Sequence, residues 1–540
     1  MVLPASGNSI SLDQIHVELG ENSGTTVALG DADVRALASD TDGAIGMDQF
    51  FGLSSNAAWI WGMTVDSVSL KKLYGNGYKD ASISASKTGD GVYLLGSRYG
   101  STSTGNADSN GENAEMNIIK LNLDGSIAWN YRLDSPEDYI YGNTAITCVA
   151  TSGADEIFVW WRGADDGDID GTSNKRRLLK LNASGVEQAE RKYSTPSSQS
   201  EFVATGPHSS KVHDDGTNIY WLGEIYGGGV AHAGAISTWW TKIRKSDGAW
   251  QDEFGTYDAS GSEYGIGAIY VDGSGNTLFA CRDPDANNRN HNFVKYNSSK
   301  QKVFEKYFSH SSGNHPYALI PYGTTFVSGD LILAHDHYCL SESGITNGDY
   351  LGILRASGSD GSVTWWKRAV ASEATGFYGV DVEKDSSSNL YMVGHGIVDG
   401  DSRYSAWIGK FNSSGVKQWN FTLGYNDDSK NILGGGIVID ANDNIYIMIT
   451  VGETGNPMRI FKIPSSGLGS ANGGLTAGQH GIYKITNVDF SFTDAPSNVS
   501  ADNADTRTPF TPSQISDASS TDITLATESG GSPITLVTPT

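Results

Sequence analysis

Short apolar runs recur along most of the chain, each following a polar turn rich in Gly, Asn, Asp or Ser. The runs are continuously apolar instead of alternating, which indicates strands that are covered on both faces. Seven such runs are present, at residues 91–96, 157–161, 219–223, 277–281, 331–334, 390–394 and 445–449.

A second pattern lies between these runs: two apolar residues, a basic residue, an apolar residue, a Gly or Ser turn, and an aromatic about nine residues after the basic one. The basic residues are spaced by 52 to 62 positions and are Lys120, Lys180, Lys242, Lys295, Arg355, Lys410 and Lys462. The aromatic residues are Trp129, Trp250, Phe304, Trp365 and Trp419, with Ala189 in their place in the second unit. Each unit therefore holds two hairpins.

Seven units of four strands predict an all-β, seven-bladed β-propeller. A solenoid is disfavoured because its repeats are usually shorter and need terminal caps. We expect an N-terminal piece around Trp59 to close the ring, because residues 59–61 and 69–74 look like a second hairpin without its first. An eighth, incomplete blade is the alternative.

Two segments lie outside the repeats, so we divide the chain into residues 1–54, 55–467 and 468–540. Residues 1–54 contain three short helix-like segments between Gly-rich turns, and Ser11 with Gln14 forms a capping box at the first. This helical segment is too short for a core of its own and is expected to dock on something. Residues 468–540 hold one strand-like run, 482–493, and a Ser/Thr-rich tail expected to be extended or ordered by a partner.

The chain's composition excludes several functional classes. A share of 66 glycines in 540 residues favours many tight turns over a helical bundle. With 37 basic and 62 acidic residues the net charge is −25, which repels nucleic acid. No apolar run is long enough for a membrane helix, and no signal peptide is recognised at the N-terminus. We therefore expect neither membrane insertion nor a nucleic-acid partner, and we expect synthesis in a cytoplasm.

Residues 3–12, 33–38 and 47–52, in this order and spacing, resemble a short module at the head of virion structural and tail-fibre proteins of tailed bacteriophages, especially those of marine cyanobacteria. The resemblance covers about a tenth of the chain. It implies that residues 1–54 bind other virion proteins, that the propeller is displayed on the particle, and that the protein is located in the virion. We also expect a homo-oligomer.

Catalytic patterns are sparse. Gly400-Asp401-Ser402 superficially resembles an esterase block but precedes no predicted helix, and His335-Asp336-His337 is better interpreted as a polar strand end than as a metal site. Neighbouring tryptophans, such as Trp239 and Trp240, are expected to pack between blades more than to bind sugars. We accordingly predict no catalytic residues and no cofactor.

One acidic run matches the front half of a calcium loop. Asp166, Asp168 and Asp170 alternate before Gly171, so their carboxylates can converge on one ion, but Arg177 stands where a full loop has its last glutamate. A solvated acidic turn is the alternative.

Two functions remain. The first is a non-enzymatic virion structural protein, such as a tail fibre or baseplate component, that contributes to assembly and host-surface recognition, with surface glycan as a ligand. The alternative is a propeller enzyme that depolymerises such a polysaccharide.

Overall fold

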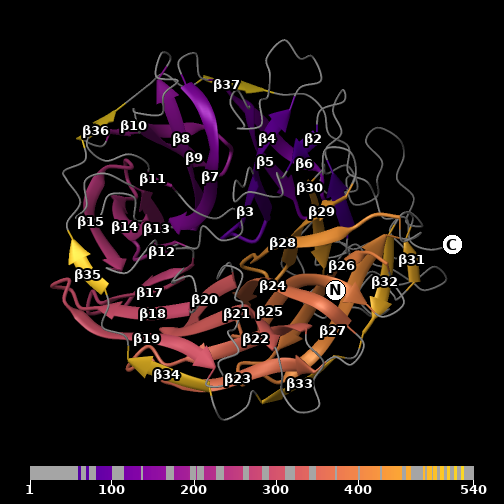
Figure 1. Cartoon of the computed structure of the whole chain (residues 1–540). Helices are drawn as coiled ribbons and strands as arrows, with labels where there is room; N and C mark the ends of the chain where they lie inside the picture. Colours follow the sequence, from indigo (N-terminus) through magenta and orange to yellow (C-terminus); the bar gives the residue numbers. More distant parts are fainter. Residues whose placement is uncertain are drawn as a thin grey trace, which may run out of the picture.

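The seven repeats fold into seven antiparallel sheets arranged around a central channel (Figure 1). The structure is a computed structural model. It describes residues 59–62, 69–71, 81–99, 115–134, 138–151, 153–165, 175–194, 202–203, 212–226, 236–258, 267–282, 291–310, 323–339, 348–370, 374–398, 402–425, 429–452, 458–463, 478–480, 483–488, 490–494, 499–503, 507–510, 516–519 and 524–527.

Each sheet is a blade whose strands follow one another from the channel outward. Blade 1 is β3 (Ala81–Ala85), β4 (Gly91–Tyr99), β5 (Glu115–Asn122) and β6 (Ile127–Asp134), with β2 (Ser69–Lys71) beside β4. Blade 2 is β7 (Asp138–Thr151), β8 (Ala154–Asp165), β9 (Lys175–Asn182) and β10 (Glu187–Ser194). Blade 3 is β12 (His213–Asp214), β13 (Asn218–Tyr226), β14 (Ile236–Arg244) and β15 (Trp250–Asp258), with β11 (Phe202–Val203) also on β13.

The remaining blades repeat this order. Blade 4 is β16 (Ile269–Val271), β17 (Thr277–Arg282), β18 (His291–Tyr296) and β19 (Lys302–His310). Blade 5 is β20 (Gly323–Val327), β21 (Asp330–Cys339), β22 (Gly348–Ala356) and β23 (Val363–Val370). Blade 6 is β24 (Ala374–Lys384), β25 (Leu390–Val398), β26 (Tyr404–Phe411) and β27 (Lys417–Tyr425). Blade 7 is β28 (Ile432–Ile439), β29 (Ile445–Val451), β30 (Met458–Ile463) and β1 (Trp59–Gly62).

The N-terminal strand β1 closes the ring by forming the outer strand of blade 7. It pairs antiparallel with β30 and places Trp59 opposite Lys462. Trp129 lies opposite Lys120 in the same way in blade 1, so Trp59 supplies the aromatic position of the last repeat. Closure by an N-terminal piece is thus confirmed, although β2 pairs with β4 instead of forming a hairpin with β1. The described residues form seven blades and no eighth.

The C-terminal segment adds a fifth strand to six blades in reverse order. The added strands, which we call the belt, are β32 (Tyr483–Asn487) on blade 6, β33 (Ser491–Asp494) on blade 5, β34 (Val499–Asn503) on blade 4, β35 (Arg507–Phe510) on blade 3, β36 (Ser516–Ser519) on blade 2 and β37 (Thr524–Thr527) on blade 1. A further strand, β31 (Gly478–His480), pairs with β32. The segment expected to be extended therefore runs along the rim of the chain's own propeller, as the yellow strands of Figure 1 show.

The hydrophobic core lies between neighbouring blades, which explains the continuous apolar runs. In β4, Val92 and Leu94 pack with Tyr446 of blade 7, whereas Tyr93 and Leu95 pack with Ile157 of blade 2. Because successive side chains of a strand point to opposite faces, each blade needs apolar residues at every position of its inner strands. The tryptophan pair Trp239 and Trp240 is buried in this core, as its sequence context predicts.

In several blades the repeated basic residue joins its blade to the next one. Lys180 donates to the carbonyl of Ser246 (3.3 Å), Lys295 to that of Gly358 (2.9 Å) and Arg355 to that of Ser413 (3.2 Å), each in the outer turn of the following blade. The same turn packs on the aromatic residue: Gly185 has φ +76°, and a Cβ there would lie 3.0 Å from the Trp129 ring. Both halves of the repeated motif are therefore structural.

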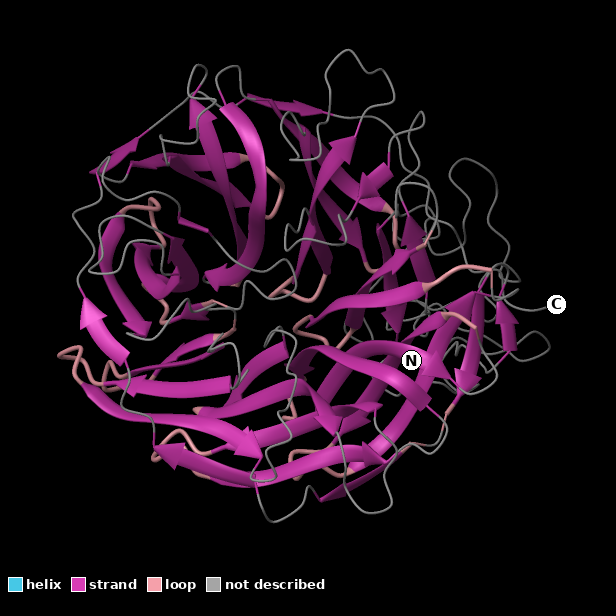
Figure 2. Cartoon of the chain, in the orientation of Figure 1, coloured by secondary structure: helices cyan, strands magenta, loops and turns pink. Residues whose placement is uncertain are grey.

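No helix occurs among the described residues (Figure 2), and none of them forms an apolar helix that could cross a membrane. The helical segment predicted within residues 1–54 lies outside the described residues.

Candidate functional site: a pocket at one end of the channel

A pocket of about 550 Å³ lies at one end of the channel. Its lining comes from the innermost strand of all seven blades: Ile83, Ser84, Ala85, Lys87, Thr147, Cys148, Val149, Val212, His213, Asp214, Ala268, Ile269, Tyr270, Thr325, Phe326, Glu383, Lys384, Val438 and Ile439. In most blades these residues end the innermost strand, so the pocket lies where those strands turn outward. Its volume is within the usual range for small-ligand sites.

His213 and Tyr270 form the aromatic wall of this pocket. Their rings meet edge to face, with centroids 5.0 Å apart, and Tyr220 lies on the other side of the imidazole at 5.9 Å. Burial lowers the pKa of His213 below its usual 6.5, and the positive charge of Lys384 lowers it slightly more. The negative charges of Asp215 and Asp214 raise the pKa and offset part of this shift. The imidazole is therefore neutral at pH 7 and able to accept a proton.

The acidic side chains of the pocket are already bound to other groups. Asp214 forms an ion pair with Lys245 (2.8 Å). Glu383 accepts a hydrogen bond from the Thr325 hydroxyl (2.9 Å) and another from the main chain of Lys384 (2.9 Å). Neither carboxylate is arranged as the proton donor of a hydrolytic carboxylate pair.

Two ammonium groups border the pocket. Lys384 donates to the carbonyl of Phe326, and its side chain is exposed. Lys87 is also exposed, and among the described residues its ammonium makes no hydrogen bond or ion pair. These cations stand out in a chain whose net charge is −25, and they suit an anionic ligand.

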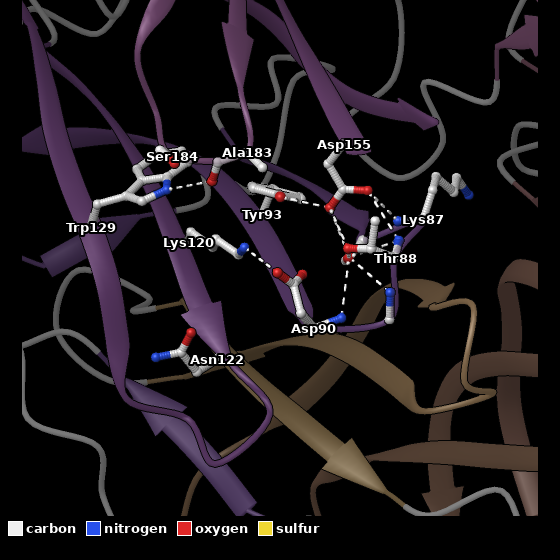
Figure 3. A network of polar contacts seen from close by, with 12 residues as sticks. Lys87, Thr88, Asp90, Tyr93, Lys120, Asn122, Trp129, Asp155, Ala183 and Ser184 are labelled. Carbon is white, nitrogen blue, oxygen red and sulfur yellow. Dashed lines mark hydrogen bonds and ion pairs between the residues drawn. The ribbon is translucent and has the colours of Figure 1, made fainter. Parts of the chain in front are cut away.

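Asp155 of blade 2 fixes the backbone that carries Lys87. Its buried carboxylate accepts hydrogen bonds from Ser86 Oγ (2.7 Å), Tyr93 Oη (2.7 Å), Lys87 N (2.8 Å) and Thr88 N (3.1 Å). Figure 3 shows that the Lys87 side chain points away from this network. The turn is therefore held by the neighbouring blade while the ammonium stays available to a ligand.

Cys148 lines the pocket but is poorly suited to act as a nucleophile. Burial raises the pKa of its thiol well above the usual value, and nearby Asp155 raises it further. A thiol that stays protonated at neutral pH reacts slowly.

Of the residues that the sequence singled out, none that the structure describes lines this pocket. Asp166, Asp168 and Asp170 lie outside the described residues, and no group of His, Cys, Asp or Glu suited to a metal occurs among the residues that are described. His335 is buried and packs edge to face on Trp366 at 5.0 Å, as a structural residue does. Calcium binding stays a prediction.

The pocket residues were missed because they are scattered. His213, Tyr270 and Lys384 come from three different repeats, each just before the polar turn that precedes an apolar run. Aligning the seven repeats on those turns and comparing the residues that end each innermost strand would have found them.

No family model matches the chain, and no curated protein matches it. Among solved structures, polysaccharide lyase Uly1 superimposes with a TM-score of 0.42 at 11% identity, covering 76% of this chain and 98% of that one. The exotype rhamnogalacturonan lyase YesX gives 0.34 at 13% identity, with 75% and 76% covered. A protein of unknown function from Dyadobacter fermentans gives 0.32 at 13% identity, with 74% and 98% covered.

These comparisons correct the expectation that the chain is not an enzyme, because the similar structures of stated activity are polysaccharide lyases. At 11% to 13% identity the likeness concerns the fold alone, so neither substrate nor mechanism is transferred from it.

Proposed function

We propose that this protein is a propeller enzyme that cleaves an acidic polysaccharide in the channel pocket. The observation that carries the proposal is the neutral imidazole of His213 against Tyr270, in a pocket bordered by the ammonium groups of Lys87 and Lys384. The pocket combines apolar walls with polar groups, which suits a sugar ring bearing a carboxylate.

The chemistry that fits these groups is elimination. A lysine ammonium partly neutralises the sugar carboxylate, which makes the proton on the adjacent carbon more acidic. His213 takes that proton as general base, the bond from the neighbouring carbon to the glycosidic oxygen breaks, and the Tyr270 hydroxyl gives a proton to the leaving oxygen. The products are a new reducing end and a sugar with a carbon–carbon double bond conjugated to its carboxylate. Hydrolysis is less well supported because Asp214 is held in an ion pair.

We further propose that the enzyme is carried on a virion and acts on host-surface polysaccharide. The support is the resemblance of residues 1–54 to a virion module. On this proposal residues 1–54 bind other virion proteins, and the particle carries several copies.

Incubation of the purified chain with a panel of uronate-containing polysaccharides tests the activity. We expect ultraviolet absorbance from the unsaturated product and new reducing ends in equal amounts. His213→Ala and Tyr270→Phe should each reduce the rate by about a hundredfold or more. Tyr404→Phe is the matched control, since Tyr404 lies beside His395 in blade 6 in a similar edge-to-face contact at 5.8 Å. Reducing ends without absorbance would indicate hydrolysis, and no new ends from any polymer would overturn the proposal.

A further inference from the structure

Blade 7 differs from the other blades at its outer edge. Blades 1 to 6 each carry a belt strand outside their fourth strand, whereas β1 of blade 7 pairs, among the described residues, with β30 alone. A strand edge of this kind is a template for another strand, and proteins generally cover it.

The course of the belt leads to this edge. The belt visits blades 6, 5, 4, 3, 2 and 1 in turn, so the next blade around the ring is blade 7. Belt strands begin at residues 483, 491, 499, 507, 516 and 524, so successive strands start 8 or 9 residues apart. Residues 528–540 follow the last of them, so the chain has enough length for one more strand.

The sequence of β37 repeats two to three residues after the place that this spacing alone predicts. Residues 523–527, which include β37, read ITLAT, and residues 534–538 read ITLVT. Three to five residues connect one belt strand to the next. Seven residues, 528–534, lie between β37 and Thr535, so this connection is long enough to reach the neighbouring blade. The Gly530-Gly531 pair allows the connecting turn.

The register also follows from the other blades. In blades 1, 2 and 4 to 6, the last residue of the belt strand pairs with the residue two positions after the one opposite the repeated basic residue. In blade 1, for example, Thr527 lies opposite Tyr131, two residues after Trp129. Trp59 holds that position in blade 7. The repeat then places Thr538 opposite Trp61 and Val537 opposite Gly62.

We propose that residues 534–538 form a seventh belt strand, whose last two residues, Val537 and Thr538, pair antiparallel with Gly62 and Trp61 on the free edge of β1. The occupant is the chain's own C-terminal segment. Strand β1 would then pair on both edges, with β30 on one side and with the last belt strand on the other. Blade 7 would thus contain one strand from the N-terminal part of the chain and one from the C-terminal part. The proposal is independent of the enzymatic function.

Hydrogen exchange of the full chain tests the proposal. Removing residues 532–540, or introducing Leu536→Pro with Val537→Pro, should make amides of residues 61–62 exchange on the order of tenfold faster, because those that face outward lose their acceptors. Ser529→Pro, in the connecting segment, is the matched control and should leave their exchange unchanged. Unchanged exchange in both altered chains would overturn the proposal.

A cross-link identifies the occupant. The double variant Trp61→Cys/Thr538→Cys should form a disulfide within one chain under mild oxidation, seen as a monomer of altered mobility on a non-reducing gel. Trp61→Cys alone should not show this band. A cross-linked dimer in place of the monomer would assign the edge to a second copy and overturn the proposal in its present form.

Discussion

Lys462 of blade 7 donates a hydrogen bond to the main-chain carbonyl of Leu123 in blade 1, with Nζ and O 2.7 Å apart across 339 positions of sequence. The seam between first and last blade is thus joined by the same contact that joins blades within the array. Asn442 Nδ2 and the carbonyl of Gly89 add a second bond across it, at 2.9 Å.

Lys462→Met should therefore destabilise the protein by about 1–3 kcal/mol, because it removes the hydrogen bond that the buried Lys462 ammonium donates to this carbonyl. Lys242→Met is the matched control: Lys242 is half-buried, lies over the Tyr220 ring at 5.4 Å, and makes no such bond among the described residues. Urea denaturation of both variants measures the difference. An equal decrease in unfolding free energy for both variants would show that the hydrogen bond between Lys462 and Leu123 adds no measurable stability.

The repeats were predictable because their signals are local. A continuous apolar run and a basic residue about nine positions before an aromatic recur within one blade, and both reflect contacts that recur from blade to blade. The last repeat has no aromatic residue about nine positions after Lys462. Trp59, from the N-terminal part of the chain, lies opposite Lys462 and fills that position.

The belt and the pocket were not predictable in the same way. Belt strands such as β36, with the sequence SDAS, have little β propensity and form because a preformed edge offers them hydrogen bonds. The pocket collects residues from seven repeats, so Lys87 and Lys384, which border the same pocket, are 297 positions apart in the sequence. Such a site leaves no motif.

The pH dependence of activity should report on His213. The imidazole acts as a base only when neutral, and burial lowers its pKa below the usual 6.5. We therefore expect the acidic limb of kcat/KM, set by His213, to have its midpoint below pH 6.5. Polymer cleavage between pH 4.5 and 8 measures this. An acidic limb centred above 6.5 would contradict the assignment.

Glu253 should make folding stability depend on pH. Burial raises the pKa of this carboxyl from 4.5 to about 7, partly offset by the hydrogen bond from Trp239. The folded chain then binds more protons than the unfolded chain between these values, so this contribution to stability is present below pH 4.5 and is lost as the pH rises towards 7. The loss amounts to about 3 kcal/mol at most. Glu253→Gln should match the wild type at pH 4.5 and exceed its stability at pH 8, by urea denaturation; parallel curves would contradict this.

Calcium should stabilise the chain if Asp166, Asp168 and Asp170 bind it. An ion that binds only the folded state raises the melting temperature with its concentration. Asp168→Ala should abolish that rise, while Asp124→Ala, in an exposed turn of blade 1, should preserve it. Melting curves with calcium and with a chelator decide the matter, and identical curves would eliminate the site.

Removal of residues 1–54 should separate attachment from folding. The truncated chain keeps β1, so the outer strand of blade 7 remains and the melting temperature should be close to that of the full chain. It should nevertheless fail to enter particles, because the segment that resembles a virion module is gone. Removal of residues 1–65 is the contrasting variant. It takes β1 away, exposes the edge of β30 and leaves Lys462 without Trp59 opposite it, so we expect a clear loss of stability as well. Melting curves and particle incorporation of the two chains distinguish these effects, and normal incorporation of the first would refute the proposed role of residues 1–54.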